Sequence, residues 1–179
     1  MFYNMKKIIF FDADGTLWYP SETKYTKHPV WVYRKYSNPH EARRQMVLIP
    51  GVIQTLRILK KKGVKLIVLS TNPREPNEAN AIMQDSVKHF KIKDFFDEVH
   101  ATREYLESKG EFILKIINKY GFTKKEALMV GDSYEWDYNS ARSVGVDALL
   151  IEHNYEKAHP NTNKVKRRIN KLSDVLKFI

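Results

Sequence analysis

Residues 8–17 read Ile-Ile-Phe-Phe-Asp-Ala-Asp-Gly-Thr-Leu, and the architecture of the chain can be inferred outward from this segment. Its four apolar residues predict a buried strand that ends at the edge of a sheet. Asp12 and Asp14 then follow one residue apart, and Gly15 allows the backbone to turn sharply. Because two acids at this spacing repel each other, we expect a metal ion or a phosphoryl site with its cation between them. The segment therefore predicts a strand end that carries a phosphoryl-transfer nucleophile.

The composition is that of a globular protein. The 179 residues suffice for one domain with a short insertion, and 42% hydrophobic residues argue against disorder. No apolar run approaches the roughly 18 residues of a membrane span. Residues 1–7 carry no cleavable signal pattern, and Met5 is a second candidate start, so a cytoplasmic location is expected. The absence of cysteine excludes disulfides, Cys-ligated metals and a thiol nucleophile.

The net charge of +10 has three explanations: nucleic-acid binding, steering of anionic substrates, or a solvated lysine-rich surface. The basic residues are spread along the chain, with one denser stretch at residues 164–168. No zinc-finger, helix-turn-helix or basic-aromatic RNA motif accompanies them. Steering of anions together with general solvation is therefore favoured, although the charge does not exclude nucleic acid.

Strand and helix patterns alternate along most of the chain. Repeated units with apolar, β-branched strands predict a mainly parallel sheet with helices on both faces, which is an α/β fold. Functional sites in such sheets form at the carboxyl ends of the strands. The predicted strands are 6–11, 64–69, 96–101, 127–130 and 147–151, and the predicted helices are 51–62, 75–90, 109–120, 137–144 and 172–179.

Residues 18–49 interrupt this alternation. A segment of this length inside a compact domain is usually functional, most often as a lid. Its aromatic residues either contact a substrate or only pack against one another, and both alternatives stay open for each of them. These residues are Trp18, Tyr19, Tyr25, Trp31, Tyr33 and Tyr36.

Polar side chains also follow the later strands. Ser70, Thr71 and Asn72 come directly after the strand 64–69 and offer donors suited to phosphoryl oxygens. Taken alone, they favour a helix-capping loop. Lys109 opens a helix, where its ammonium group and the helix N-terminus can both face an anion. Taken alone, Lys109 is better explained as a solvated lysine.

Further acids follow the strand 127–130. Asp132 and Ser133 come directly after it, and Asp137 lies close behind. These residues also have a purely structural explanation. Asp132 and Ser133 could cap the next helix, and Asp137 could interact favourably with the dipole of that helix. However, Asp12 and Asp132 at the ends of two strands can converge on one hard cation. Carboxylate oxygens with a phosphate partner suit Mg²⁺.

The order of these motifs resembles that of the haloacid dehalogenase-like hydrolase superfamily. Residues 11–17 are similar to its first motif, Asp-x-Asp-Gly-Thr, and Ser70 is similar to the second. Lys109 resembles the third motif, and Gly131-Asp132-Ser133 with Asp137 resembles the acidic fourth. The resemblance spans residues 6–152 and is greatest to magnesium-dependent phosphatases with minimal caps. It implies a three-layer Rossmann-like fold, a single domain over 1–179, and a short cap at 18–49.

The resemblance also implies a mechanism. Asp12 would attack phosphorus and form an aspartyl-phosphate, while Asp14 would protonate the leaving oxygen and later take a proton from the attacking water. Mg²⁺ would be held by the carboxylates of Asp12 and Asp132 and by the backbone carbonyl of Asp14.

The remaining polar residues would support these three aspartates. Ser70 and Lys109 would hold the phosphoryl oxygens, with Thr71 and Asn72 as further donors. Ser133 and Asp137 would act outside the direct metal ligands, Asp137 by orienting a metal-bound water or by pairing with Lys109. Gly110 stands where many relatives carry proline.

Other activities within the superfamily are less compatible with these residues. Asp14 argues against a dehalogenase, which needs no acid at that position, and the segment 18–49 is short for the cap of a phosphomutase. Two alternatives to a phosphatase remain. One is a phosphomutase-type phosphotransferase, and the other is a catalytically idle basic module that binds nucleic acid or protein. The substrate would be a phosphorylated small molecule or a phosphoprotein, and the oligomeric state is open. Candidate substrate contacts outside the motifs are His28, His40, Arg74 and Arg103.

Overall fold

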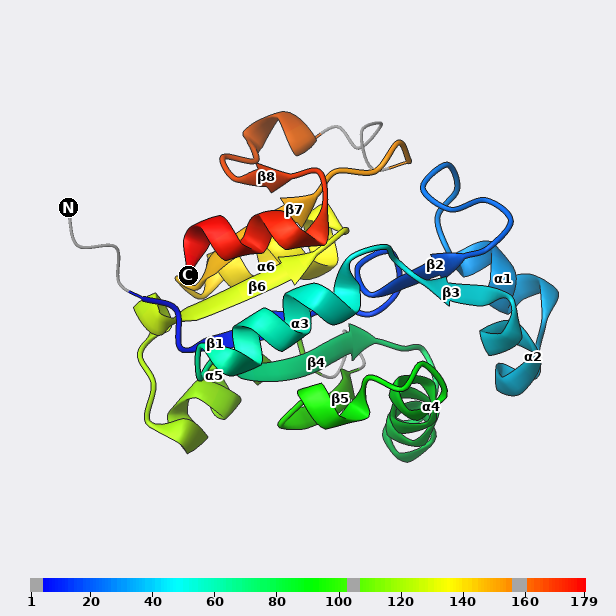
Figure 1. The fold of residues 1–179 in the computed structure, drawn as a ribbon, viewed down its shortest axis with the longest axis horizontal. Helices are drawn as coiled ribbons and strands as arrows, with labels where there is room; N and C mark the ends of the chain where they lie inside the picture. The colour runs from blue at the N-terminus through cyan, green and yellow to red at the C-terminus, as the bar shows by residue number, and fades with distance from the viewer. Residues whose placement is uncertain (1–4, 103–106, 156–160) are drawn as a thin grey trace.

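A computed structural model describes residues 5–102, 107–155 and 161–179. Its centre is a six-stranded sheet in the order β5-β4-β1-β6-β7-β8, with parallel pairing between all neighbours (Figure 1). The predicted mainly parallel sheet is thus confirmed. The chain order reverses at β1, which is where α/β sheets form ligand sites. The strands are β1 (Ile8–Phe11), β4 (Lys65–Thr71), β5 (Glu98–Thr102), β6 (Ala127–Gly131), β7 (Asp147–Ile151) and β8 (Arg168–Ile169).

Both faces of this sheet are apolar, so helices must cover both. In β1, Ile9 and Phe11 pack into one core layer, whereas Ile8 and Phe10 pack into the other, and all four are fully buried. Burying a side chain of this size stabilises the fold by about 1.5–3 kcal/mol. The two-residue alternation of the central strand therefore requires a three-layer fold.

The helices divide between the two faces. The first layer contains α3 (Val52–Lys61), α4 (Pro76–His89) and the C-terminal helix (Leu172–Phe178), of which α3 and the red C-terminal helix lie side by side in Figure 1. The opposite layer contains α5 (Lys109–Tyr120) and α6 (Ser140–Ser143).

Two predicted α-helices take other forms. The C-terminal helix is a 3₁₀ helix, in which Leu172, Val175 and Phe178 pack against the core. The helix expected over 137–144 begins instead as a wide π-helical turn, Tyr134–Asn139, and continues as the four residues of α6.

That π-helical turn coincides with the inward position of Asp137. One carboxylate oxygen of Asp137 accepts a hydrogen bond from the Ser133 N–H at 3.0 Å. Gly131 lies so close that a Cβ atom there would be 2.2 Å from the Asp137 carboxyl carbon. π-helical turns are frequent at functional sites. Here the wide turn carries Asp137 toward the carboxyl edge of the sheet.

The segment between β1 and α3 is more ordered than a loop. β2 (Trp18–Pro20) and β3 (Met46–Leu48) pair antiparallel, and α1 (Val30–Lys35) and α2 (Pro39–Arg44) lie between them. Figure 1 shows these elements gathered at one end of the sheet, next to α4. The strands have three residues each, too few for a periodic sequence pattern, so the sequence did not predict them.

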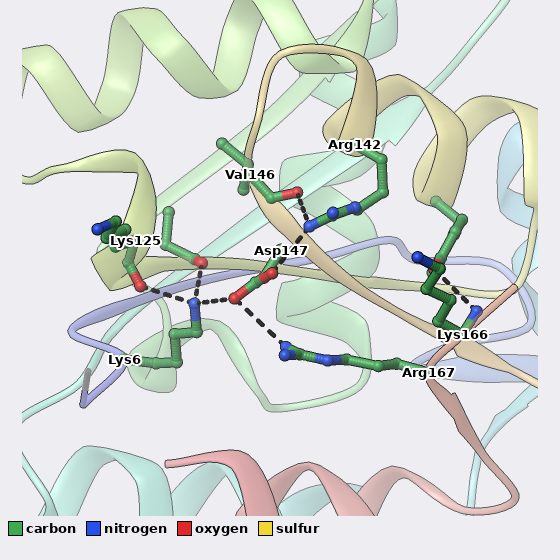
Figure 2. Close-up of polar contacts among 9 residues, drawn as sticks. Lys6, Lys125, Arg142, Val146, Asp147, Lys166 and Arg167 are labelled. Atoms are coloured by element: carbon green, nitrogen blue, oxygen red, sulfur yellow. Dashed lines mark hydrogen bonds and ion pairs between the residues drawn. The ribbon is translucent and has the colours of Figure 1, made fainter. Parts of the chain in front are cut away.

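An ion-pair cluster holds together the amino edge of the sheet, where the strands begin. The buried Lys6 ammonium donates to Asp147 Oδ2 at 2.7 Å and to the carbonyl oxygens of Lys125 and Ala127. Asp147 also pairs with Arg142 at 2.8 Å and with Arg167 at 3.3 Å, so that three cations converge on one acid (Figure 2). We refer to Lys6, Arg142, Asp147 and Arg167 as the amino-edge cluster.

The charges of this cluster determine the ionisation of its acid. Burial disfavours the ionised carboxylate of Asp147, but the hydrogen bond and charge of Lys6, with those of Arg167 and Arg142, outweigh it. The pKa of Asp147 therefore lies below its ordinary value.

Among the helices of the described ranges, none combines the length and the hydropathy of a transmembrane span.

Candidate active site

The carboxyl ends of three neighbouring strands bring the predicted site residues together. Asp12 follows β1, Asp132 follows β6, and Ser70 lies near the end of β4. Because Phe11 lies opposite Val130 in the β1–β6 pair, Asp12 and Asp132 emerge side by side. All three side chains are buried. The parallel register thus gathers residues that are far apart in the sequence.

Lys109 lies at the centre of this group. Its ammonium nitrogen is 2.5 Å from Asp12 Oδ1 and 2.5 Å from Asp137 Oδ1, and only 1% of the residue is exposed. Burial disfavours the charged ammonium, but Asp12 and Asp137 outweigh that effect and raise the pKa of Lys109. Lys109 is therefore a permanent cation between two acids.

Gly110 explains how Lys109 reaches this position. Its N–H donates to Ser140 Oγ at 2.9 Å, and a Cβ atom on residue 110 would lie 2.3 Å from the Ser140 carbonyl oxygen. Proline has no N–H to make this bond. In this chain, the glycine allows α5 to pack directly against α6.

Asp12, Asp132 and Asp137 form a buried group of three acids. Each offers an oxygen atom, and these atoms lie within 4.8 Å of one another. Lys109 supplies one positive charge against three carboxylates. Burial and the charges of Asp12 and Asp137 raise the pKa of Asp132 well above its ordinary value. Burial also raises the pKa of Asp137 to about 7, against the opposing effect of Lys109.

This arrangement fits a hard divalent cation. An all-oxygen donor set and a deficit of positive charge are the properties that Mg²⁺ sites require. Gly15, with φ at +75°, lies directly against the group, since a Cβ atom there would be 2.0 Å from Asp132 Oδ2. Residue 15 must therefore be glycine for the backbone after Asp14 to approach Asp132.

The Asp14 carboxylate is separate from these three acids. Its Oδ1 accepts hydrogen bonds from Trp18 Nε1 at 2.7 Å and from the Tyr33 hydroxyl at 2.8 Å. Burial and the charge of Asp12 raise the pKa of Asp14 to about 7, although the two hydrogen bonds act in the opposite direction. A carboxyl group with this pKa is suited to proton transfer near neutral pH.

The aromatic residues of the 18–49 segment therefore divide into two groups. Trp18 and Tyr33 contact Asp14, whereas Tyr19 packs against Tyr25 with ring centroids 4.9 Å apart. Trp31 donates to the Thr23 hydroxyl and, within the described ranges, makes no hydrogen bond with the acids.

Ser70, Thr71 and Asn72 line a pocket of about 370 Å³ together with the acids. We call it the acidic pocket. The Thr71 hydroxyl is buried and has no hydrogen-bond partner among the described residues, so it can donate to a ligand. Asn72 Oδ1 accepts from the Arg74 N–H at 2.9 Å, which is a turn within the loop and not a helix cap, because α4 begins at Pro76 without a side-chain cap. This bond leaves the Asn72 amide NH₂ group for a ligand. Ser133 supports Asp137 through its N–H and caps the π-helical turn.

The other candidate contacts have different surroundings. His28 lines the acidic pocket, whereas His40 lies 3.3 Å from an Arg43 nitrogen. Arg74 pairs with Glu78 and with the Ser37 carbonyl oxygen. Arg103 and Met1 lie outside the described residues.

Two residues beyond β7 also belong to the site, although no sequence motif indicates them. The Tyr155 hydroxyl donates to Asp132 Oδ2 at 2.5 Å, and His153 Nε2 lies 2.5 Å from the Gly15 carbonyl oxygen. His153 is buried and stacks against Tyr25, which joins the C-terminal part of the chain to the 18–49 segment. The only available signal was their place just after a strand, at the edge where sites form.

Known proteins resemble this chain in sequence and in fold. The sequence model of the haloacid dehalogenase-like hydrolases matches residues 18–151. The chain is 28% identical over 124 residues to the pyrophosphatase PpaX of Halalkalibacterium halodurans, covering 68% of this chain and 54% of that protein. It is 27% identical over 127 residues to the phosphoglycolate phosphatase of Pseudomonas putida, covering 70% and 43%. The chain thus spans about half the length of these curated relatives.

A solved structure agrees over nearly its whole length. The haloacid dehalogenase-like hydrolase from Streptococcus pneumoniae superimposes with a TM-score of 0.73 at 21% identity, covering 97% of this chain and 98% of that one. This likeness concerns the fold, and the match to the family model concerns the sequence. Because that match covers most of the chain, the chain belongs to the haloacid dehalogenase-like hydrolase family.

Proposed function

We propose that this chain is a Mg²⁺-dependent phosphatase that hydrolyses a phosphate monoester through an aspartyl-phosphate intermediate. The observation that carries the proposal is the different setting of the two acids after β1. Asp12 lies among buried carboxylates and is paired with Lys109, whereas Asp14 is held apart with a pKa of about 7. The names of the two curated relatives support phosphate chemistry.

The metal would be held by the carboxylates of Asp12 and Asp132 and by the backbone carbonyl of Asp14. Asp137 is less available as a direct ligand, because Lys109 occupies its Oδ1 and the Ser133 N–H occupies its Oδ2. We therefore assign Asp137 to positioning Lys109. When bound, Mg²⁺ would neutralise the carboxylates and the phosphoryl oxygens.

The protein groups would carry the two chemical steps. In the first, an Asp12 oxygen forms a bond to phosphorus as the bond to the leaving oxygen breaks, and Asp14 gives that oxygen its proton. In the second, Asp14 takes a proton from water as the water oxygen attacks phosphorus and releases Asp12. Lys109, Ser70 and Thr71 would donate to the phosphoryl oxygens, where charge stabilisation contributes most of the rate.

We further propose that residues 18–49 act as a short cap within a single domain. Trp18 and Tyr33 come from this segment and hold Asp14, so closure of the cap and orientation of the general acid would be linked. A phosphorylated small molecule would enter between the cap and the sheet. A cytoplasmic location stays a prediction.

The test is the substitution Asp12→Asn. Hydrolysis of p-nitrophenyl phosphate with Mg²⁺ should fall by at least about 1,000-fold, because the amide cannot form the intermediate. Asp94→Asn, which makes the same change at an exposed aspartate away from the pocket, is the matched control and should keep parental activity. Persistent turnover in Asp12→Asn would contradict the nucleophile assignment. Salt-sensitive oligonucleotide binding by a protein without turnover would support the binding module instead.

A further inference from the structure

A second pocket adjoins the acidic pocket on the side of residues 18–49. Its volume is about 220 Å³, and it shares Asp14, Ser70 and Thr71 with the acidic pocket. From there it extends between the 18–49 segment and α4, where apolar walls include Trp18 and Phe90, whose rings stack at 4.9 Å. We call it the cap pocket. Its place beside Asp14 is where the leaving group of a bound phosphate ester would lie.

Arg43, on α2, lines the cap pocket and is 92% buried. Its guanidinium makes three long contacts, none of them with an acid: Ser86 Oγ at 3.2 Å, His40 Nδ1 at 3.3 Å and the Ile82 carbonyl oxygen at 3.4 Å. Within the described ranges, no acidic side chain pairs with Arg43. A guanidinium remains charged at all physiological pH values, so this is a buried cation without a counter-ion.

The other charges around the cap pocket do not neutralise Arg43. Arg74 also lines it, but this residue is paired with Glu78. Asp14 is the one acid among the described lining residues, and it is already bonded to Trp18 and Tyr33. Burying a charge without a partner is costly, and two of the five guanidinium N–H groups have no described acceptor. The end of the pocket near Arg43 therefore has the positive charge and the free N–H donors that an anion-binding site needs.

We propose that Arg43 binds a second anionic group on the substrate, a carboxylate or a phosphate carried by the leaving group. The proposal rests on the proposed phosphatase activity and narrows its substrate class to small phosphate monoesters with an acidic far end. The small volume supports this class, since pockets for larger ligands have about 300–1,000 Å³. A carboxylate or phosphate can accept two parallel hydrogen bonds from a guanidinium, which gives geometric selectivity.

The experiment compares matched substrates that differ only in this second group. Each phosphoryloxy carboxylate of two, three and four carbon atoms is paired with the diol monophosphate of the same length, and a bisphosphate of the best length is added. We expect kcat/KM of the parent protein to favour one carboxylate or the bisphosphate by about 10- to 100-fold over its neutral pair. Arg43→Gln should abolish this preference, and Arg43→Lys should keep part of it. Arg44→Gln, the matched control on the same helix, removes an exposed arginine and should leave the preference unchanged.

Three outcomes would overturn the proposal or separate it from the proposed function. Turnover of all esters without preference for an acidic group would reject the role of Arg43 while leaving the phosphatase intact. If Arg43→Gln lowers kcat/KM equally for both members of a pair and also lowers the melting temperature, Arg43 only connects α2 to α4. If no ester is hydrolysed, calorimetric binding of the same pairs to parent and Arg43→Gln protein tests the proposal without catalysis, and equal affinities for both members would reject it.

Discussion

The two edges of the central sheet carry the same kinds of charged groups in opposite proportions. At the carboxyl edge, Asp12, Asp132 and Asp137 surround the single cation Lys109. At the amino edge, three cations of the amino-edge cluster surround the single acid Asp147. The pKa of Asp132 is accordingly raised, mainly by burial, whereas that of Asp147 is lowered.

The comparison shows how the surroundings of an aspartate determine whether it contributes stability or reactivity. At the amino edge the protein itself neutralises the charge of Asp147, and the amino-edge cluster joins β7 to the chain before β1, to α6 and to the start of β8. The carboxyl edge gathers three acids around one lysine, an arrangement that costs stability and that a divalent cation would relieve. Functional sites commonly contain such perturbed groups.

The largest effect is expected from Asp132→Asn, compared with Asp147→Asn. The change at the carboxyl edge should lower kcat with Mg²⁺ by about 1,000-fold, because it removes a proposed metal ligand. It should also remove the stabilisation that Mg²⁺ gives the parent protein, about 2.7 kcal/mol at one hundred times the Kd. Asp147→Asn should keep both properties. Steady-state kinetics and thermal denaturation with and without Mg²⁺ measure them, and an intact Mg²⁺ response in Asp132→Asn would refute the assignment.

Without metal, the same two variants should change stability in opposite directions. The folded-state pKa of Asp132 is raised, so ionisation of this acid lowers the stability of the fold as the pH rises above the unfolded pKa of 3.8. The free energy of unfolding of Asp132→Asn should therefore exceed that of the parent protein by about 1 kcal/mol near pH 8 and by little near pH 4. The folded-state pKa of Asp147 is lowered, so its stabilisation is present above pH 3.8 and is lost as the pH falls through the folded value.

Asp147→Asn should accordingly lose about 1–2 kcal/mol near pH 7, a moderate value because water screens part of this acid. Urea denaturation in the presence of a chelator, repeated across this pH range, measures both differences. Equal signs for the two variants near neutral pH would contradict the contrast between the edges.

The smallest effect is expected from Tyr33→Phe. The Tyr33 hydroxyl lowers the pKa of Asp14, so its removal should move that pKa upward from about 7. Because Asp14 must be protonated to act as an acid, kcat falls as the pH rises through this pKa, and the alkaline limb should move to higher pH by less than about one unit. Tyr120→Phe removes a similar tyrosine–carboxylate bond, to Glu98, away from the site and should leave the profile unchanged. A downward shift in Tyr33→Phe would contradict the hydrogen-bond argument.

Much of the fold was predictable because its signals are local. The apolar run 8–11 followed by Asp12, Asp14 and Gly15 predicted the end of β1, and the bounds of α5 match the predicted helix 109–120. The 18–49 segment was less predictable, because Trp18 pairs with Leu48, thirty positions away, in strands too short for a pattern. The π-helical turn also escaped prediction, because it depends on where the Asp137 side chain points.

The residues of the candidate site were likewise predictable only in part. Motif order identified the candidate acids and Lys109, but the sequence left two roles open for Asp137, and the structure shows it in contact with Lys109. Tyr155 and Arg43 belong to no motif, and their places depend on the packing of β7 and α2 against the rest of the chain.

The sequence by itself determined which residues form the buried strands and which reactive side chains stand at their ends, because hydrophobic periodicity and turn chemistry act between near neighbours. Only the tertiary structure decided how the charges are shared: one lysine among three acids at one edge, one acid among three cations at the other, and Arg43 without an acid partner among the described residues. Coulomb interactions and desolvation depend on distance and burial, and both are set by segments that are far apart in the chain.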